Sequence, residues 1–190
     1  RAAALASAVS DRVATAWRLS SKLRRLRRTL GIAEPAPVVD PRVPVFAVWH
    51  PGVGVPLALG MITAYARIHE DGAVGRRYDI GRPQSADDVL AALAAGTGPA
   101  VLLCSDYLWT VDDNLDVARR AKALRPELIV IHGGPSCPKY DGESEEFLRR
   151  HADAADVVVR GEGELTVARL LAAAEALPTL DVESVQHVAA

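Results

Sequence analysis

Glycine and aromatic residues gather directly after the apolar runs of this sequence. Four such loops stand out: 50–56 (HPGVGVP), 105–110 (SDYLWT), 133–137 (GGPSC) and 161–164 (GEGE). Glycine lets a ligand lie against the backbone, while Tyr107 and Trp109 offer flat apolar surface for a ring system. Each glycine could equally serve only a tight turn. Four loops of this kind together favour a ligand site.

Other residues with reactive side chains have less support from their surroundings. Cys104 with His132 could form a thiol nucleophile and its base, but Cys104 lies inside an apolar run, where a free cysteine is usually a small hydrophobe. Cys137 lies in a loop, so we expect it to be more accessible. His50 could ligate a metal, although a lone loop histidine usually does not. The glycines match neither G-x-G-x-x-G nor G-x-x-x-x-G-K-[ST].

Strongly apolar segments alternate with amphipathic ones from residue 45 onward. Predicted strands cover 45–49, 76–81, 100–105, 128–132 and 157–160. Predicted helices cover about 57–69, 85–93, 110–124 and 165–177. Ser85 with Asp88, and Thr110 with Asp113, have the spacing of helix caps. In the first helix, one face carries the apolar residues Leu57, Met61, Tyr65 and Ile68.

Nearly all-apolar strands that alternate with helices predict an α/β fold with a parallel sheet covered on both faces. We expect a flavodoxin-like, Rossmann-like doubly wound sheet of five strands in the order 2-1-3-4-5, preceded by an N-terminal helix. In such sheets, ligands bind outside the carboxyl ends of the strands. The four glycine and aromatic loops all fall at that edge.

The segments outside this alternation suggest further parts of the chain. Residues 1–31 are expected to form an amphipathic helix, and 32–44 a proline-rich linker. The main domain would then span 45–177, with a tail at 178–190. The basic cluster 22–28 could touch phosphate or an acidic partner, but more often such a run is a solvated helix face.

Composition limits the classes of partner. The 190 residues include 49% hydrophobic and 24% charged residues, enough for one domain of about 150 residues and an appendage. The formal net charge of -2 gives no support for a nucleic-acid surface. No apolar run approaches the roughly 18 residues of a membrane span, and two distant cysteines favour a reducing cytoplasm. Because the chain opens on Arg1 and not on Met, we expect its true start to be missing.

Three loops, SDYLWT, IHGGP and VVVRGEGE, resemble the cobalamin-binding domain of B12-dependent radical S-adenosylmethionine enzymes. In that family the third strand ends in serine, an aromatic residue and Trp-Asn, the fourth in Gly-Gly-Pro, and the fifth in Arg-Gly-Glu-Gly-Glu. The resemblance covers about 45–177. The matching residues are Ser105, Tyr107, Trp109, Gly133, Gly134, Pro135, Arg160, Gly161, Glu162, Gly163 and Glu164.

The resemblance implies a binding site for cobalamin. The dimethylbenzimidazole tail would enter a cleft between sheet and helices, against the glycine backbone, and the corrin would rest on the strand ends. The expected cofactor-binding residues are Trp49, His50, Pro51, Gly52, Ser105, Tyr107, Leu108, Trp109, Gly133, Gly134, Pro135, Gly161, Glu162 and Gly163. We expect no catalytic residue and no protein metal ligand in this chain.

The loop after the first strand departs from better-known cobalamin modules. Those modules carry D-x-H-x-x-G, whose histidine ligates cobalt, whereas this chain has Val48-Trp-His-Pro-Gly-Val53. We therefore expect base-off cobalamin, as methylcobalamin or hydroxocobalamin, with no histidine on the metal. Trp49 or its neighbours would cover the lower face of the corrin.

Radical chemistry needs a second domain. A [4Fe–4S] cluster requires three cysteines, usually C-x-x-x-C-x-x-C, which two isolated cysteines cannot supply. S-adenosylmethionine and the cluster would therefore belong to a C-terminal radical domain of the same polypeptide. The expected reaction of the whole enzyme is methyl transfer to an unactivated carbon or phosphorus.

Two alternatives stay open at this point. The chain could be a free-standing cobalamin carrier, or a receiver-like or nucleotide-binding regulatory module. Asp106 stands near the phosphorylatable position of a receiver, but the loop WHPGVG has no acid for the metal that receivers need.

Overall fold

The computed structural model describes residues 42–50, 52, 54 and 56–173. The predicted N-terminal helix, most of the linker, Pro51 and the tail at 178–190 lie outside the described residues. Within them, β1 (Val43–Trp49), β2 (Tyr78–Ser85), β3 (Val101–Ser105), β4 (Ile129–Gly133) and β5 (Val157–Val159) alternate with helices. The helices are α2 (Leu57–Arg77), α3 (Ala86–Ala95), α4 (Val111–Leu124), α5 (Asp141–Arg150) and α6 (Gly163–Ala173).

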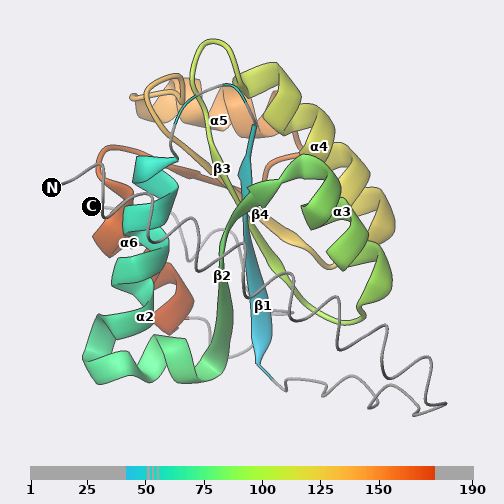
Figure 1. The fold of residues 1–190 in the computed structure, drawn as a ribbon. Helices are drawn as coiled ribbons and strands as arrows, with labels where there is room; N and C mark the ends of the chain where they lie inside the picture. Colours follow the sequence, from blue (N-terminus) through green and yellow to red (C-terminus); the bar gives the residue numbers. More distant parts are fainter. Residues whose placement is uncertain (1–41, 51, 53, 55, 174–190) are drawn as a thin grey trace, which may run out of the picture. The chain divides into compact units, whose positions relative to one another are not determined.

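All five strands are parallel and form one sheet in the order β2-β1-β3-β4-β5, which confirms the predicted topology (Figure 1). Helices α2 and α6 cover one face of the sheet, and α3, α4 and α5 lie on the other. Each face has its own apolar core. The middle strand β3 contributes alternately to both, with Leu103 in the first core and Leu102 in the second. This alternation explains why β3 is apolar throughout.

Several element boundaries differ from those predicted. Strand β1 starts at Val43, so Val43 and Pro44 belong to the sheet and not to the linker. Strand β2 begins at Tyr78 and continues to Ser85, with a register shift against β1. Helix α2 runs beyond residue 69, but residues 69–72 have non-helical backbone, so it consists of two helical parts.

The apolar face identified in α2 is not the face that is buried. Leu57, Met61, Tyr65 and Ile68 are all exposed, whereas Leu59, Thr63 and Ala66 are buried. Helix α6 packs against the other face of α2, where Ala168 lies in the same apolar cluster as Leu59 and Ala66. The position of α6 therefore determines which face of α2 is buried.

Helix α5 was not predicted, because its sequence DGESEEFLRR is mostly polar and has no apolar period; none of its residues is buried. The two predicted caps have different outcomes. Ser85 caps α3 as expected, because its side chain accepts a hydrogen bond from the Asp88 amide at 3.2 Å. Thr110 does not cap α4.

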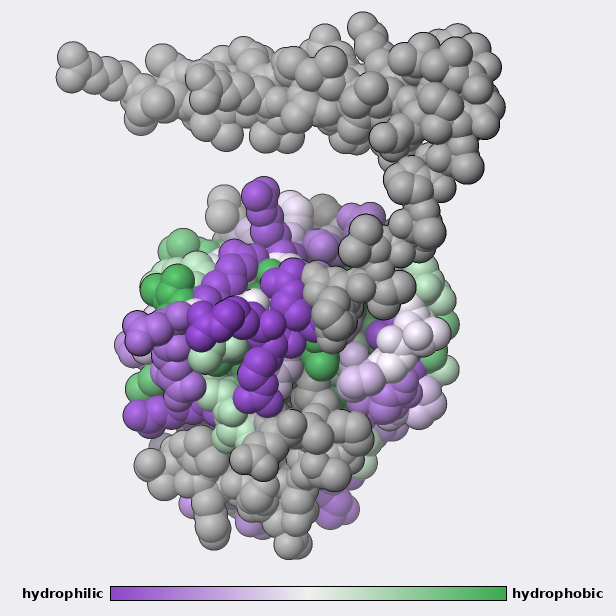
Figure 2. Space-filling view, turned by 90° about the horizontal axis from the view of Figure 1, so that it is seen from below, coloured by the Kyte–Doolittle hydropathy of each residue, from purple (hydrophilic) through white to green (hydrophobic). Residues whose placement is uncertain are grey.

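The two edges of the sheet differ in character. Figure 2 looks onto the amino ends of the strands, where hydrophilic side chains gather across the middle of the face. At the carboxyl ends, large apolar side chains are exposed in loops or first helical turns: Leu57, Leu108, Trp109, Tyr140 and Leu165. No helix among the described residues is long and apolar enough to span a bilayer.

Candidate functional site

A cavity of about 360 Å³ opens at the carboxyl edge between the sheet and helices α2 and α6. Its floor consists of the ends of β3, β4 and β5, and Ile62 and Val167 contribute apolar wall from the two helices. Eight of the predicted site residues line it: Ser105, Tyr107, Gly133, Gly134, Pro135, Gly161, Glu162 and Gly163.

A second cavity, of about 210 Å³, lies beside the first and is lined by Trp49, His50 and Trp109. The two cavities share four lining residues and so adjoin each other: Ala58, Leu59, Ser105 and Tyr107. Leu108 lines neither cavity and is 83% exposed. Gly52 lines neither as well. The structure thus brings most of the predicted residues into two adjoining hollows.

The aromatic pair of the β3 loop is stacked on itself. The rings of Tyr107 and Trp109 lie 5.3 Å apart with an interplanar angle of 17°. Trp109 remains 64% exposed, whereas Leu115 and Val117 of α4 are buried. An indole held open to solvent beside a cavity is available to a ligand.

The loop after β1 is closed by its own side chain. The Trp49 indole Nε1–H donates to the Gly54 carbonyl at 2.8 Å, and Gly54 has φ of +88°. Because positive φ suits glycine, the sequence permits this tight closure. The closure holds the Trp49 ring in the wall of the smaller cavity.

Gly134 has a reason within the protein for lacking a side chain. Its φ is +115°, and an added Cβ would lie 2.7 Å from the Asp106 carbonyl oxygen and 2.9 Å from the Asp106 nitrogen. The Asp106 N–H donates to the Gly133 carbonyl at 2.6 Å, and the Ser136 N–H donates to the Asp106 carbonyl at 3.0 Å. Backbone hydrogen bonds therefore join the β3 and β4 loops beside the cavity.

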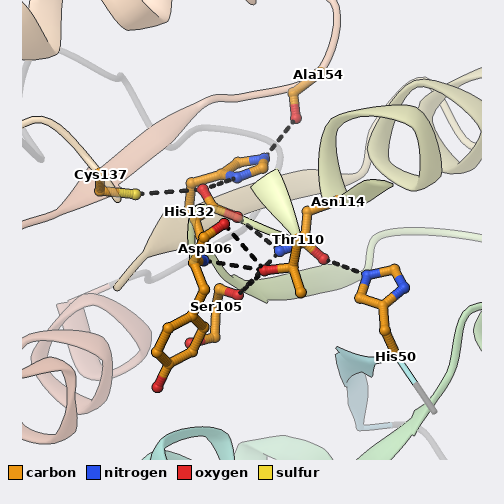
Figure 3. A network of polar contacts seen from close by, with 9 residues as sticks. His50, Ser105, Asp106, Thr110, Asn114, His132, Cys137 and Ala154 are labelled. Atoms are coloured by element: carbon orange, nitrogen blue, oxygen red, sulfur yellow. Dashed lines mark hydrogen bonds and ion pairs between the residues drawn. The ribbon is translucent and has the colours of Figure 1, made fainter. Parts of the chain in front are cut away.

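The Asp106 carboxylate is fully buried and lies at the centre of a polar network (Figure 3). Its Oδ2 lies 2.7 Å from His132 Nδ1 and accepts a hydrogen bond from the Cys137 thiol at 3.3 Å. Its Oδ1 accepts from Asn114 Nδ2 at 2.7 Å. Hydrogen bonds from surrounding donors stabilise a buried carboxylate that would otherwise be costly to desolvate.

The network continues to the cavity wall through Asn114. Its Nδ2 also donates to the Ser105 carbonyl at 3.1 Å, and its Oδ1 lies 2.8 Å from His50 Nε2. Thr110 supports the same turn, since its hydroxyl donates to the Ser105 carbonyl and accepts from the Tyr107 N–H. Thr110 is thus occupied in the β3 loop, which explains why it does not cap α4.

The network residues Asn114 and Asp106 were not predicted as part of the site. A signal existed for Asn114. It falls in register with the buried positions Val117, Ala118 and Ala121 of α4, where a polar residue needs a partner. No local signal identifies that partner.

The cysteine predictions meet different outcomes. Cys104 is buried as expected, and burial raises its thiol pKa well above the ordinary value. Cys137 was expected to be accessible, but it is only 5% exposed and bonded to Asp106. Burial, and then the nearby Asp106 charge, raise the Cys137 pKa strongly. Neither thiol is suited to act as a nucleophile at neutral pH, because the thiolate is the reactive form.

The receiver alternative does not fit this geometry. Asp106 is inaccessible to solvent, and its oxygens are occupied by His132, Asn114 and Cys137. A phosphorylatable aspartate needs an open side chain beside a bound metal. Within the part of the chain that the structure describes, no group of three or more His, Cys, Asp or Glu side chains could hold one.

Fold and cavities together define a doubly wound α/β domain with two adjoining cavities at the carboxyl edge of the sheet. The model of the B12 binding domain family matches residues 46–171, and the chain belongs to that family. This confirms the resemblance noted from the three loops.

Two curated proteins are similar to this chain over the same region. One is a 2-(S-pantetheinyl)-carbapenam-3-carboxylate methyltransferase from Streptantibioticus cattleyicolor, 37% identical over 118 residues. The other is the cobalamin-dependent radical SAM methyltransferase TokK from Streptomyces tokunonensis, 32% identical over 119 residues. Each match covers 62% of this chain, but only 16% and 17% of the two relatives. The chain therefore corresponds to about a sixth of their length.

Proposed function

We propose that this chain is the cobalamin-binding part of a B12-dependent radical S-adenosylmethionine methyltransferase. The observation that carries the proposal is the pair of adjoining cavities at the carboxyl edge, formed by the loops that resemble the family. The two relatives, one a methyltransferase and one a cobalamin-dependent radical SAM methyltransferase, support the same activity for the whole protein.

The larger cavity has the properties needed for the nucleotide tail of cobalamin. Its volume of about 360 Å³ falls within the range of small-molecule sites, and its walls are mainly apolar. The backbone of Gly133, Gly161 and Gly163 forms part of its lining. At Gly161 an added Cβ would meet no atom within 4 Å, so the space there is free for a ligand.

The smaller cavity suits the lower face of the corrin ring. Trp49, Tyr107 and Trp109 provide aromatic surface around it, and each ring is positioned by a contact described above. Burial of these rings against the macrocycle would exclude water from that face. In the whole enzyme the bound cofactor would supply the methyl group, while a C-terminal domain would hold S-adenosylmethionine and the iron–sulfur cluster.

We infer that cobalamin is bound base-off and without a histidine on cobalt. Val48 stands where better-known modules have the aspartate that supports their histidine, so that partner is missing. His50 instead directs Nε2 toward Asn114. The work of this chain is then to bind the tail, orient the ring and shield one face.

Titration with hydroxocobalamin, followed by its visible absorbance, tests the proposal. We expect stoichiometric binding, and a loss of about fivefold to 150-fold in affinity for Trp109→Ala, from the roughly 1–3 kcal/mol of a buried aromatic contact. Leu124→Ala is the matched control, because Leu124 is also exposed but ends α4 at the opposite edge. Absence of binding, or equal affinity of both variants, would contradict the assignment.

Two further measurements address the finer claims. Electron paramagnetic resonance of the reduced, paramagnetic cofactor should lack nitrogen splitting from an axial ligand. A splitting that disappears in His50→Ala would contradict the absence of a histidine ligand. A C-x-x-x-C-x-x-C motif in the polypeptide beyond residue 190 would support the radical domain.

A further inference from the structure

The donor and acceptor roles in the polar network can be assigned step by step, starting at Asp106. An ionised carboxylate only accepts hydrogen bonds, and Asp106 Oδ1 lies 2.7 Å from the side-chain amide of Asn114. The Ser105 carbonyl, which also only accepts, lies 3.1 Å from the same amide nitrogen. The Asn114 amide must therefore turn its nitrogen inward to both oxygens, because the flipped amide would face oxygen with oxygen.

The same assignment of donors and acceptors extends to His50. With its nitrogen committed, Asn114 presents Oδ1 to the ring, and this oxygen can only accept. His50 must then carry hydrogen on Nε2. When the ring is neutral, Nδ1 has the only free lone pair, and Figure 3 shows this second nitrogen pointing away from the network.

The same carboxylate fixes the neighbouring loops. The backbone of Asp106 bonds to Gly133 and Ser136 of the β4 loop, and its side chain bonds to Cys137 farther along that loop. Through Asn114 it reaches His50 in the loop after β1, 64 positions from Asn114. One buried residue therefore links three of the loops that surround the two cavities.

We propose that Asp106 and Asn114 are positioning residues that orient His50 so that its Nδ1 accepts a hydrogen bond from an amide N–H of the bound cofactor. This inference rests on the proposed function, because the rim of the corrin carries primary amides, and such donors match a bare ring nitrogen. His50 lies in the wall of the smaller cavity, where we place the ring. Its role is recognition and not metal ligation.

The first experiment uses the ligand-free protein, so its result does not depend on cobalamin. Histidine is labelled with ¹⁵N, and His50 is assigned by its absence in His50→Gln. We expect Nε2 to carry the proton of the neutral ring, and that proton to exchange slowly with solvent. Asn114→Leu should abolish the slow exchange. Cys137→Ala, which also removes one donor from Asp106 but not the route to His50, should preserve it.

The second experiment measures hydroxocobalamin affinity in two variants at the cavity wall. His50→Gln keeps a donor for Asn114 and an acceptor for the ligand, so its affinity should stay within about threefold of the parent. His50→Leu keeps neither and should bind about threefold to tenfold more weakly, as expected for one neutral hydrogen bond. Because both changes lie at the wall, unfolding is not the expected cause.

The outcomes separate this inference from the proposed function. A proton on Nδ1 of neutral His50, or unchanged exchange in Asn114→Leu, overturns the positioning role even if cobalamin binds. Equal affinity of His50→Gln and His50→Leu overturns the recognition role, as does a nitrogen ligand on cobalt that disappears in both variants. If the protein binds no cobalamin while the exchange results hold, the positioning role stands and the proposed function fails.

Discussion

Replacement of Gly134 by alanine should destabilise the fold itself, before any effect on a ligand. Two costs combine. A non-glycine residue at φ of +115° adopts a sparsely populated conformation, at about 1–3 kcal/mol. In addition, the new Cβ would lie 2.7 Å from the Asp106 carbonyl oxygen, so the β4 loop must move and weaken its two backbone hydrogen bonds, each contributing about 1 kcal/mol.

The expected loss for Gly134→Ala is therefore about 4 kcal/mol, or roughly 10–20 °C in Tm for a domain of this size. Thermal and urea unfolding followed by circular dichroism would measure it. Two matched variants isolate the causes. Gly161→Ala has φ of +73° but open space, and should lose about 1 kcal/mol. Gly133→Ala meets only ordinary contacts at 3.5 Å or more, and should stay within about 1 kcal/mol of the parent.

The order of stability of these three variants tests the proposed cause. If Gly134→Ala melts within a few degrees of Gly161→Ala, the contact with the Asp106 backbone does not explain the glycine. A variant with normal stability but lost cobalamin binding would instead show that Gly134 is small because the ligand lies against it. The structure places both the cavity and Asp106 beside this residue, so only the measurement separates the two reasons.

Three further outcomes follow from the buried polar groups. Asp106→Ala should cost about 3–5 kcal/mol in urea unfolding, because it leaves buried donors unpaired, while Asp106→Asn, which keeps an acceptor, should cost less. Cys104 and Cys137, whose pKa values are raised by burial, should resist iodoacetamide at pH 8 until the protein is unfolded; rapid labelling of the native protein would contradict their burial. Burial and the charges of Arg119 and Arg150 lower the His151 pKa, so the unfolded state binds more protons. Stability should therefore fall as pH drops below about 6.5, and His151→Gln should flatten that dependence in urea midpoints measured from pH 8 to 5.

The sequence by itself determined the strands and their order in the sheet. Runs such as LLC in β3 and VI (130–131) in β4 are buried on both faces, so their pattern depends on no particular neighbour. The cap at Ser85 is also local, because donor and acceptor are three residues apart. Once the sheet is parallel, every loop that follows a strand falls on the same edge. The position of the glycine and aromatic loops was therefore predictable as well.

The tertiary structure alone decided which face of α2 is buried. Periodicity showed that Leu57, Met61, Tyr65 and Ile68 share a face, but not that a partner helix would cover it. The buried face is the one that packs against α6. A hydrophobic stripe identifies a helix face, whereas its burial depends on a neighbour about a hundred residues away in the chain.

The polar network is likewise a product of tertiary structure. Asp106 and His132 are 26 positions apart in the sequence, and His50 and Asn114 are 64 apart, so no local sequence pattern predicts either pair. The residues meet because β1, β3 and β4 are adjacent in the sheet and α4 returns across them. Because these residues are buried, they cannot form hydrogen bonds with water, so an unpaired polar group would cost free energy. The sequence supplied the donors and acceptors, and only the packing of the strands determined which of them would pair.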